Sequence, residues 1–207
     1  FFPYLIINNE TDKFDQLIQD HKVIPISTIS NKYISLCNES GNPVSFFSDK
    51  FGFRNNNSVY SENSEKIIFI GDSFIIGFCH NDNDIIASIV DNALDSKRVL
   101  NLSHGGTGPL IQSAIIREYT QSVNFNEIYW FLFTGNDFIN MEQEFQNVYL
   151  KKYVNQNYSQ NLNVRQNNVD NIYLQIAADY IKPEDDFIQR YKKKKIDLIN
   201  LLELTEI

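Results

Sequence analysis

Residues 66–78 read KIIFIGDSFIIGF, and this segment decides the fold. The run 66–70 is short, apolar and rich in β-branched residues, which predicts a strand buried on both faces of a sheet. Gly71 allows a tight turn that a Cβ would obstruct, Asp72 and Ser73 follow it, and the next apolar stretch can open a helix. This order places the Ser73 hydroxyl at the carboxyl end of a sheet, where open α/β sheets bind ligands.

The same turn also has a purely structural interpretation. Asp and Ser are both favoured helix N-caps, so Asp72 or Ser73 could simply cap the helix that follows. If the hydroxyl instead takes part in chemistry, the free N–H groups of the first helical turn would stabilise a negative charge formed beside it. Two later segments of the chain favour this second interpretation.

Composition limits the classes of function. The chain has 207 residues, 43% of them hydrophobic and 21% charged, which is typical of one globular domain with a core. Its formal net charge is −8 and its pI is about 4.9, which argues against nucleic-acid binding. It contains no run of 18 apolar residues, so the sequence predicts no membrane span. The apolar start FFPYLII is compatible with the remnant of a removed signal or membrane anchor, or with an arbitrary boundary.

The N-terminal part is expected to be a small β-rich extension, residues 1–62, that packs on a main domain, residues 63–207. Residues 11–21 have the apolar spacing of a short amphipathic helix. Residues 23–29 are β-prone, and residues 33–47 predict a hairpin with its turn at Glu39-Ser40-Gly41-Asn42.

Two more strand-and-loop units follow the serine turn. The strands are expected at 98–102 and 127–134, the helices at 84–94 and 109–122, and the loops are SHGGTG at 103–108 and GNDF at 135–138. Alternation of strands and helices predicts a parallel sheet with helices on both faces. Right-handed crossovers would bring the loops after all three strands to one edge of that sheet.

The C-terminal third predicts helices at 141–154, 163–181 and 183–203, and no further core strand. A three-stranded parallel sheet would leave the apolar strand 127–134 on an exposed edge. We expect that edge to be covered by a second copy, by N-terminal strands, or by chain beyond Ile207. We favour the last, so that the domain is incomplete at its C-terminus.

The three loops together carry the groups that an acyl-transfer site needs. Ser73 is the candidate nucleophile. The N–H groups of Ser73 and Gly106 and the side-chain amide of Asn136 are candidate donors to an oxyanion. Glycine lets the backbone approach a ligand closely, and asparagine donates without titrating.

Residues 65–138 resemble the SGNH/GDSL hydrolase superfamily. Three blocks in order carry the resemblance: GDSF at 71–74, NLSHGGTG at 101–108 and GND at 135–137. It implies a flavodoxin-like three-layer α/β/α fold and an esterase with no cofactor and no metal. The implied catalytic residues are Ser73, Gly106 and Asn136, with substrate contacts from Asp72, Thr107 and Asp137.

Other segments resemble an exported bacterial branch of that superfamily, namely SDKFGFRN at 48–55, LCNESG at 36–41 and FCH at 78–80. The branch implies acyl groups on cell-surface glycans as substrates, and a periplasmic or extracellular location, with anchoring through a missing N-terminal segment as one option. In an exported protein we expect Cys37 and Cys79 to form a disulfide that ties the hairpin to the helix after Ser73. Otherwise they are small buried apolar residues.

One block of the superfamily is missing. A D-x-x-H near the C-terminus supplies the general base, and no D-x-x-H follows Asp137 here. A serine hydroxyl needs such a base at neutral pH. His21, His80 and His104 all lie upstream, and for His104 a structural or surface-loop role is favoured. The base is therefore expected beyond Ile207.

Three hypotheses remain open at this point: a serine esterase, an O-acyltransferase acting on a polysaccharide, or a non-catalytic glycan-binding domain that lacks the base. A D-x-x-H block downstream would favour an enzyme. Phosphate binding is a weaker alternative, because the chain is acidic and the three loops hold no Lys or Arg. Arg54 is either a surface cation or a clamp for an anionic group of the substrate.

Overall fold

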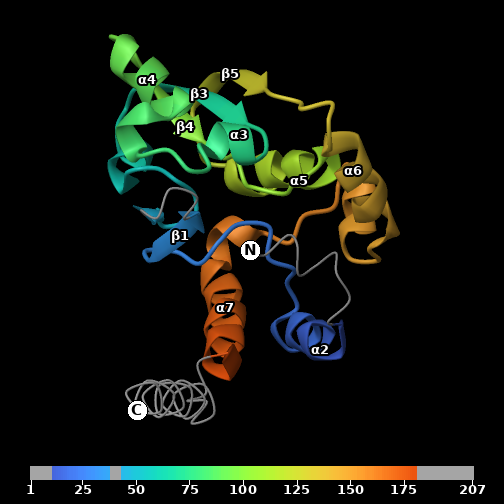
Figure 1. Cartoon of the computed structure of the whole chain (residues 1–207). Coiled ribbons are helices and arrows are strands. Elements are labelled where there is room, and N and C mark those ends of the chain that lie inside the picture. The colour runs from blue at the N-terminus through green and yellow to red at the C-terminus, as the bar shows by residue number, and fades with distance from the viewer. Residues whose placement is uncertain (1–10, 38–42, 181–207) are drawn as a thin grey trace, which may run out of the picture. The chain divides into compact units, whose positions relative to one another are not determined.

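The computed structural model describes residues 11–37 and 43–180 (Figure 1). The chain divides into two compact units, Phe1–Ile172 and Tyr173–Ile207. Residues 1–62 and the three predicted strands all belong to the first unit. In the second unit the described residues form the end of helix α7 (Gln166–Tyr180). The expected hairpin turn at 39–42 and the expected helix at 183–203 lie outside the described residues.

A three-stranded parallel sheet forms the centre of the first unit, in the order β4-β3-β5. Its strands are β3 (Glu65–Ile70), β4 (Lys97–Asn101) and β5 (Phe125–Trp130). Every residue of β3 after Glu65 is buried, which confirms a central strand covered on both faces. The strand expected at 127–134 was placed too late in the sequence. The N–H of Phe131 still bonds to the oxygen of Ile70, where β3 ends, so the following residues have no strand beside them.

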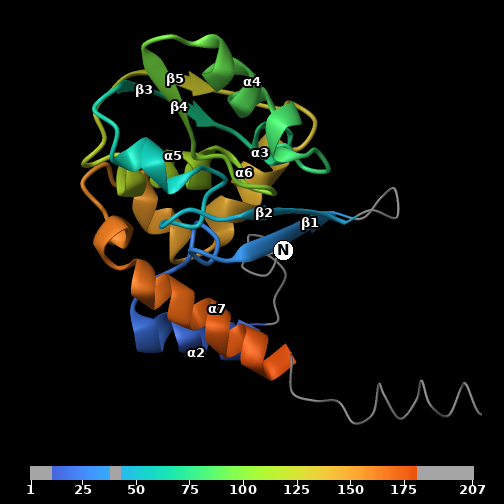
Figure 2. The ribbon, with the colours of Figure 1, turned by 90° about the vertical axis from the view of Figure 1, so that its left-hand side faces the viewer.

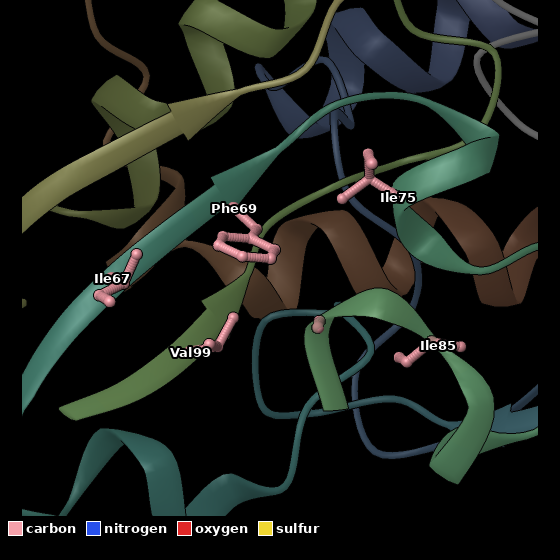
Figure 3. Packing of buried hydrophobic residues seen from close by; sticks show 6 residues of the cluster. Ile67, Phe69, Ile75, Ile85 and Val99 are labelled. Atoms are coloured by element: carbon pink, nitrogen blue, oxygen red, sulfur yellow. The ribbon is translucent and has the colours of Figure 1, made fainter. Parts of the chain in front are cut away.

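One face of the sheet packs against α3 (Ser73–Ile76) and α4 (Ile86–Ala93). Ile67 and Phe69 alternate along β3 to face this side, and they form a buried cluster with Val99, Ile75 and Ile85 (Figure 3). Burying such side chains stabilises the fold by roughly 1.5–3 kcal/mol each. The serine turn is therefore held between a strand and a helix that share one core.

The other face carries α5 (Pro109–Tyr119). Ile68, Ile70 and Leu100 point away from the first cluster and are fully buried, as are Ile111 and Ile115 of the helix. Figures 1 and 2 show α5 on the opposite side of the sheet from α4. The protein therefore has a mixed α/β fold with a three-stranded parallel sheet, an arrangement compatible with three layers.

The N-terminal elements are α2 (Thr11–His21) and an antiparallel hairpin of β1 (Tyr33–Cys37) and β2 (Val44–Phe47), which confirms the predicted helix and hairpin. The β-prone residues 23–29 form no strand, so that prediction was wrong. Instead, the N–H of Ile24 donates to Oε1 of Gln160 at 2.7 Å, and its oxygen accepts from Nε2 at 3.2 Å. A side-chain amide thus takes the place of a neighbouring strand.

The helix expected at 141–154 is two elements, α6 (Asp137–Gln146) and the 3₁₀ helix η3 (Leu150–Val154). Asn147 separates them because its Oδ1 accepts the N–H groups of Tyr149 and Leu150.

The buried carboxylate of Glu118 in α5 holds the segment 153–162 by accepting four hydrogen bonds. The donors are the Tyr153 and Ser159 hydroxyls and the N–H groups of Gln160 and Leu162.

The two edges of the sheet differ. On the outer edge of β4, Asp91 accepts the N–H of Val99 at 2.7 Å, and the Asn55 amide bonds both to the N–H and to the oxygen of Asn101 at 2.9 Å. Side chains thus block this edge against another strand. The β5 edge leaves Ile128, Tyr129 and Trp130 40–47% exposed. Within the described residues, the sheet can be extended only beside β5.

Candidate active site

Ser73 is the first residue of α3, directly after the turn that ends β3, and it is half-buried. The carboxylate of Asp72 accepts the N–H of Phe74 at 3.0 Å, so Asp72 is the helix N-cap, as the structural interpretation expects. The Ser73 hydroxyl lies 3.4 Å from the other oxygen of Asp72, at the long limit of a hydrogen bond. The cap is thus supplied by Asp72, and the hydroxyl of Ser73 is left available.

The loop after β4 lies against this turn. The N–H of His104 donates to the oxygen of Gly71 at 3.1 Å. A Cβ built on Gly105 would lie 3.8 Å from the Cβ of Ser73, so the loop backbone passes directly beside the serine. Gly106 follows at φ +73°, in the left-handed region that favours glycine. The glycine-rich loop at 103–108 therefore borders the candidate nucleophile.

The loop after β5 joins the same edge of the sheet. The rings of Phe74 and Phe133 are in contact, with centroids 4.8 Å apart. Asn136 begins α6 but caps no N–H of that helix, and its Oδ1 is buried without a hydrogen-bond partner. An asparagine at this position usually accepts from the first helical turn. The amide of Asn136 is therefore not committed to holding the helix.

The second and third loops also pack on each other. A Cβ on Gly108 would come within 2.6 Å of the Met141 nitrogen and 2.9 Å of the Asp137 oxygen, so only glycine fits there. All three loops thus meet at one edge of the sheet. The structure shows Ser73 beside Gly105, but no hydrogen bond joins Ser73, Gly106 and Asn136 to one another.

The three residues expected to contact substrate are buried, with Asp72 3% exposed and Thr107 and Asp137 fully covered. The Thr107 hydroxyl donates to the oxygen of His104 at 2.7 Å. One carboxylate oxygen of Asp137 accepts the N–H of Phe133 at 2.9 Å. Burial raises the pKa of Asp137, and the nearby charge of Asp72 raises it further. These side chains hold the loops in shape and offer little surface to a substrate.

Glu144 supports the glycine-rich loop and could not be identified from a motif. Its fully buried carboxylate accepts the N–H groups of Gly108, Leu110 and Ile111, the last two at 3.0 and 3.2 Å. Burial raises the pKa of Glu144 to about 7, against the effect of these three donors. One signal was present in the sequence: α5 begins at Gly108-Pro109, and glycine has no side chain with which to cap the helix.

Gln112 is a second supporting residue that sequence reasoning missed. Its buried amide donates to the oxygen of Thr107 at 2.9 Å and accepts the indole N–H of Trp130 at 2.6 Å. It therefore connects the end of β5 to the glycine-rich loop.

None of the three histidines forms a hydrogen bond with the Ser73 hydroxyl, as a general base would. His104 is buried, and its Nδ1 lies 3.0 Å from the oxygen of Gly105. Burial lowers the pKa of His104 to about 4, so this side chain is neutral near pH 7. His80 is exposed, and His21 ends α2. In the described part of the chain, Asp72 is the only group that accepts a hydrogen bond from Ser73.

Arg54 is not a surface cation, so that alternative was wrong. Its side chain is buried, pairs with Asp82 at 2.7 Å and donates to the backbone oxygens of Ile76, Gly77 and His80. Arg54 therefore holds the C-terminal end of the helix that starts at Ser73.

Cys37 and Cys79 are joined in a disulfide with Cα atoms 5.4 Å apart. The bond connects strand β1 to the segment that follows α3, which is the connection expected from the sequence. The chain just after α3 is therefore fixed twice, by the disulfide and by the hydrogen bonds of Arg54.

A groove of about 710 Å³ lies outside these three loops, between residues 54–59 and 82–92.

Of the helices in the described residues, none is long and apolar enough to cross a membrane. Within the same residues, no cluster of His, Cys, Asp or Glu is suited to hold a metal. No protein-family model, curated protein or solved structure matches this chain.

Proposed function

We propose that the protein is a serine-dependent esterase of the SGNH type, built on a flavodoxin-like domain. The observation that carries the proposal is the meeting of the three loops around a half-buried serine whose neighbour, Asp72, already caps the helix. A serine needed only for capping would not require the glycine-rich loop 103–108 to pass directly beside it. The three sequence blocks support the same proposal.

In the proposed reaction the Ser73 oxygen attacks the carbonyl carbon of an ester. The N–H groups of Ser73 and Gly106 and the Asn136 amide would stabilise the oxyanion of the tetrahedral intermediate. Loss of the alcohol leaves an acyl-enzyme, which water then hydrolyses to a carboxylic acid. The resemblance assigns the base to a D-x-x-H block that these 207 residues do not contain.

O-acyl transfer uses the same first half-reaction, with a sugar hydroxyl in place of water as the acceptor. An extracytoplasmic location forms part of the proposal and is supported by the disulfide, because such bonds persist mainly in oxidising compartments.

A second candidate is a non-catalytic glycan-binding domain that has kept the fold. One observation favours it: the only histidine in the three loops, His104, is buried and bonded to Gly105. This candidate predicts glycan binding without ester hydrolysis.

Hydrolysis of p-nitrophenyl acetate separates the two candidates. The esterase proposal predicts hydrolysis that falls at least a thousandfold in Ser73→Ala and is unchanged in Ser122→Ala, a substitution at an exposed serine after α5. The assay uses the full-length protein, so that the expected base is present; if Ser73→Ala retains the activity there, or if the full-length protein has none, the esterase proposal fails.

A further inference from the structure

The groove between residues 54–59 and 82–92 has a chemically distinctive lining. Five asparagines and two serines line it, over a floor that includes Val59, Ile85 and Val99. Within the described residues, the side chains of Asn83, Ser88 and Asn92 have no hydrogen-bond partner. They are therefore available to a ligand.

The charged side chains that line the groove form ion pairs with one another. Arg54 pairs with Asp82 at 2.7 Å and Arg98 with Asp91 at 2.8 Å, and all four residues line the groove. An anionic ligand would have to compete with carboxylates that already hold both cations, at a cost in desolvation. The groove therefore favours an uncharged ligand.

The strand edge in the groove is also already paired. The outer edge of β4 bonds to Asp91 and to Asn55, which both line the groove. A peptide therefore cannot bind there by adding a strand to the sheet. A ligand must instead be recognised through side-chain amides and hydroxyls.

One aromatic ring completes the lining. Phe47 of β2 is 49% exposed and packs against Tyr33 in a T-shaped pair, with ring centroids 5.2 Å apart. An exposed ring offers a flat apolar face to the C–H groups of a sugar ring, while asparagines bond to its hydroxyls. A volume of about 710 Å³ lies within the range of ligand pockets, roughly 300–1,000 Å³.

We propose that this groove binds a neutral saccharide. As a binding site the proposal stands alone; as a subsite for the substrate acylated at Ser73 it rests on the proposed function. The connection is helix α3, which begins at Ser73 and ends at Ile76, whose oxygen accepts from Arg54 in the groove wall at 3.1 Å. Four residues of helix span roughly 6 Å, so the serine and the groove wall lie at the two ends of one turn.

The test is a titration of ¹⁵N-labelled protein followed by NMR. The probes are the neutral tetrasaccharides of xylose, glucose and N-acetylglucosamine, the anionic tetramer of galacturonic acid, and the peptide acetyl-Thr-Val-Thr-Val amide. We expect saturable shifts at residues 54–59 and 82–92 with at least one neutral sugar, and weaker or no shifts with the acid and the peptide.

Two variants locate the site. Ser88→Trp places an indole in the groove and should weaken sugar binding at least tenfold, as should Asn83→Ala combined with Asn92→Ala. Asn126→Ala, at an exposed asparagine on β5, is the matched control and should bind normally. No saturable shift with any neutral sugar, stronger binding of the acid or the peptide, or full binding by Ser88→Trp would overturn the proposal.

The two proposals can fail separately. Ser73→Ala should bind the sugar as the unmodified protein does, and Ser88→Trp should hydrolyse p-nitrophenyl acetate at the original rate. Sugar binding without ester hydrolysis would leave the groove assignment standing and refute the esterase. Ester hydrolysis without sugar binding would leave the esterase proposal standing and refute the groove assignment.

Discussion

The carboxylate of Glu144 lies beneath Gly108 and accepts its backbone N–H, together with the N–H groups of Leu110 and Ile111. A residue of α6 thus performs for α5 what an N-cap side chain performs within one helix. Because Gly108 ends the glycine-rich loop, this contact also fixes the loop that borders Ser73.

The first prediction concerns pH. The pKa of Glu144 is raised from 4.5 to about 7, so the folded protein keeps a proton that the unfolded chain releases between those values. The stabilising contribution is therefore complete below about pH 4.5 and is lost as the pH rises through about 7. In urea unfolding from pH 5 to 8, the free energy of unfolding should fall more steeply for the unmodified protein than for Glu144→Gln. Parallel pH profiles would contradict this.

The second prediction compares two glycines. A Cβ on Gly77 would lie 2.1 Å from Cγ2 of Ile85, and Gly77 has φ +78°. We expect Gly77→Ala to lower the free energy of unfolding by roughly 2 kcal/mol or more. Gly105→Ala brings only an ordinary contact with Ser73 and should cost less than about 1 kcal/mol. Chemical denaturation measures both, and equal losses would show that the loop at Gly105 is packed differently.

The third prediction uses the single tryptophan of the chain. Gln112→Leu removes the acceptor of the Trp130 indole N–H and the donor to the oxygen of Thr107. The second loss leaves a buried oxygen without a partner and should cost about 1–3 kcal/mol. Tryptophan emission should shift, and stability should fall. Gln143→Leu, at an exposed position on α6, is the control and should leave both unchanged. An unshifted emission spectrum in Gln112→Leu would argue against the Trp130–Gln112 bond.

The fourth prediction concerns the disulfide. Cys37 and Cys79 are separated by 42 residues, and closing a loop of this length stabilises the folded state by roughly 3–4 kcal/mol. Replacing both with serine should lower the free energy of unfolding by about that amount, and a reducing agent should then have no further effect. A native protein whose unfolding is unaffected by reductant would contradict the pairing.

The parts of the fold that follow local patterns could be predicted from the sequence. Residues 66–70 are apolar on both faces and end at a glycine, so β3 and the turn at Ser73 were placed correctly. Thr11–His21 and the hairpin have clear periodicities and were also found. By contrast, residues 23–29 have the composition of a strand, but their backbone bonds to Gln160, more than a hundred residues away.

The supporting residues of the site could not be predicted for the same reason. Glu144, Gln112 and Arg54 are polar side chains that sequence alone would place at the surface. Each is buried because it has a partner far along the chain: the start of α5 for Glu144, the Trp130 indole for Gln112 and the end of α3 for Arg54. No local spacing encodes such contacts. The candidate nucleophile was identifiable because Ser73 lies within a short, continuous motif.

The most direct test of the central claim is a crystal structure of the full-length protein treated with a fluorophosphonate, which forms a stable adduct with an activated serine. We expect a single adduct on Ser73, with the phosphoryl oxygen within about 3 Å of the N–H groups of Ser73 and Gly106 and of the Asn136 amide. A protein that stays unlabelled, a label on another residue, or a phosphoryl oxygen turned away from Gly106 and Asn136 would contradict it.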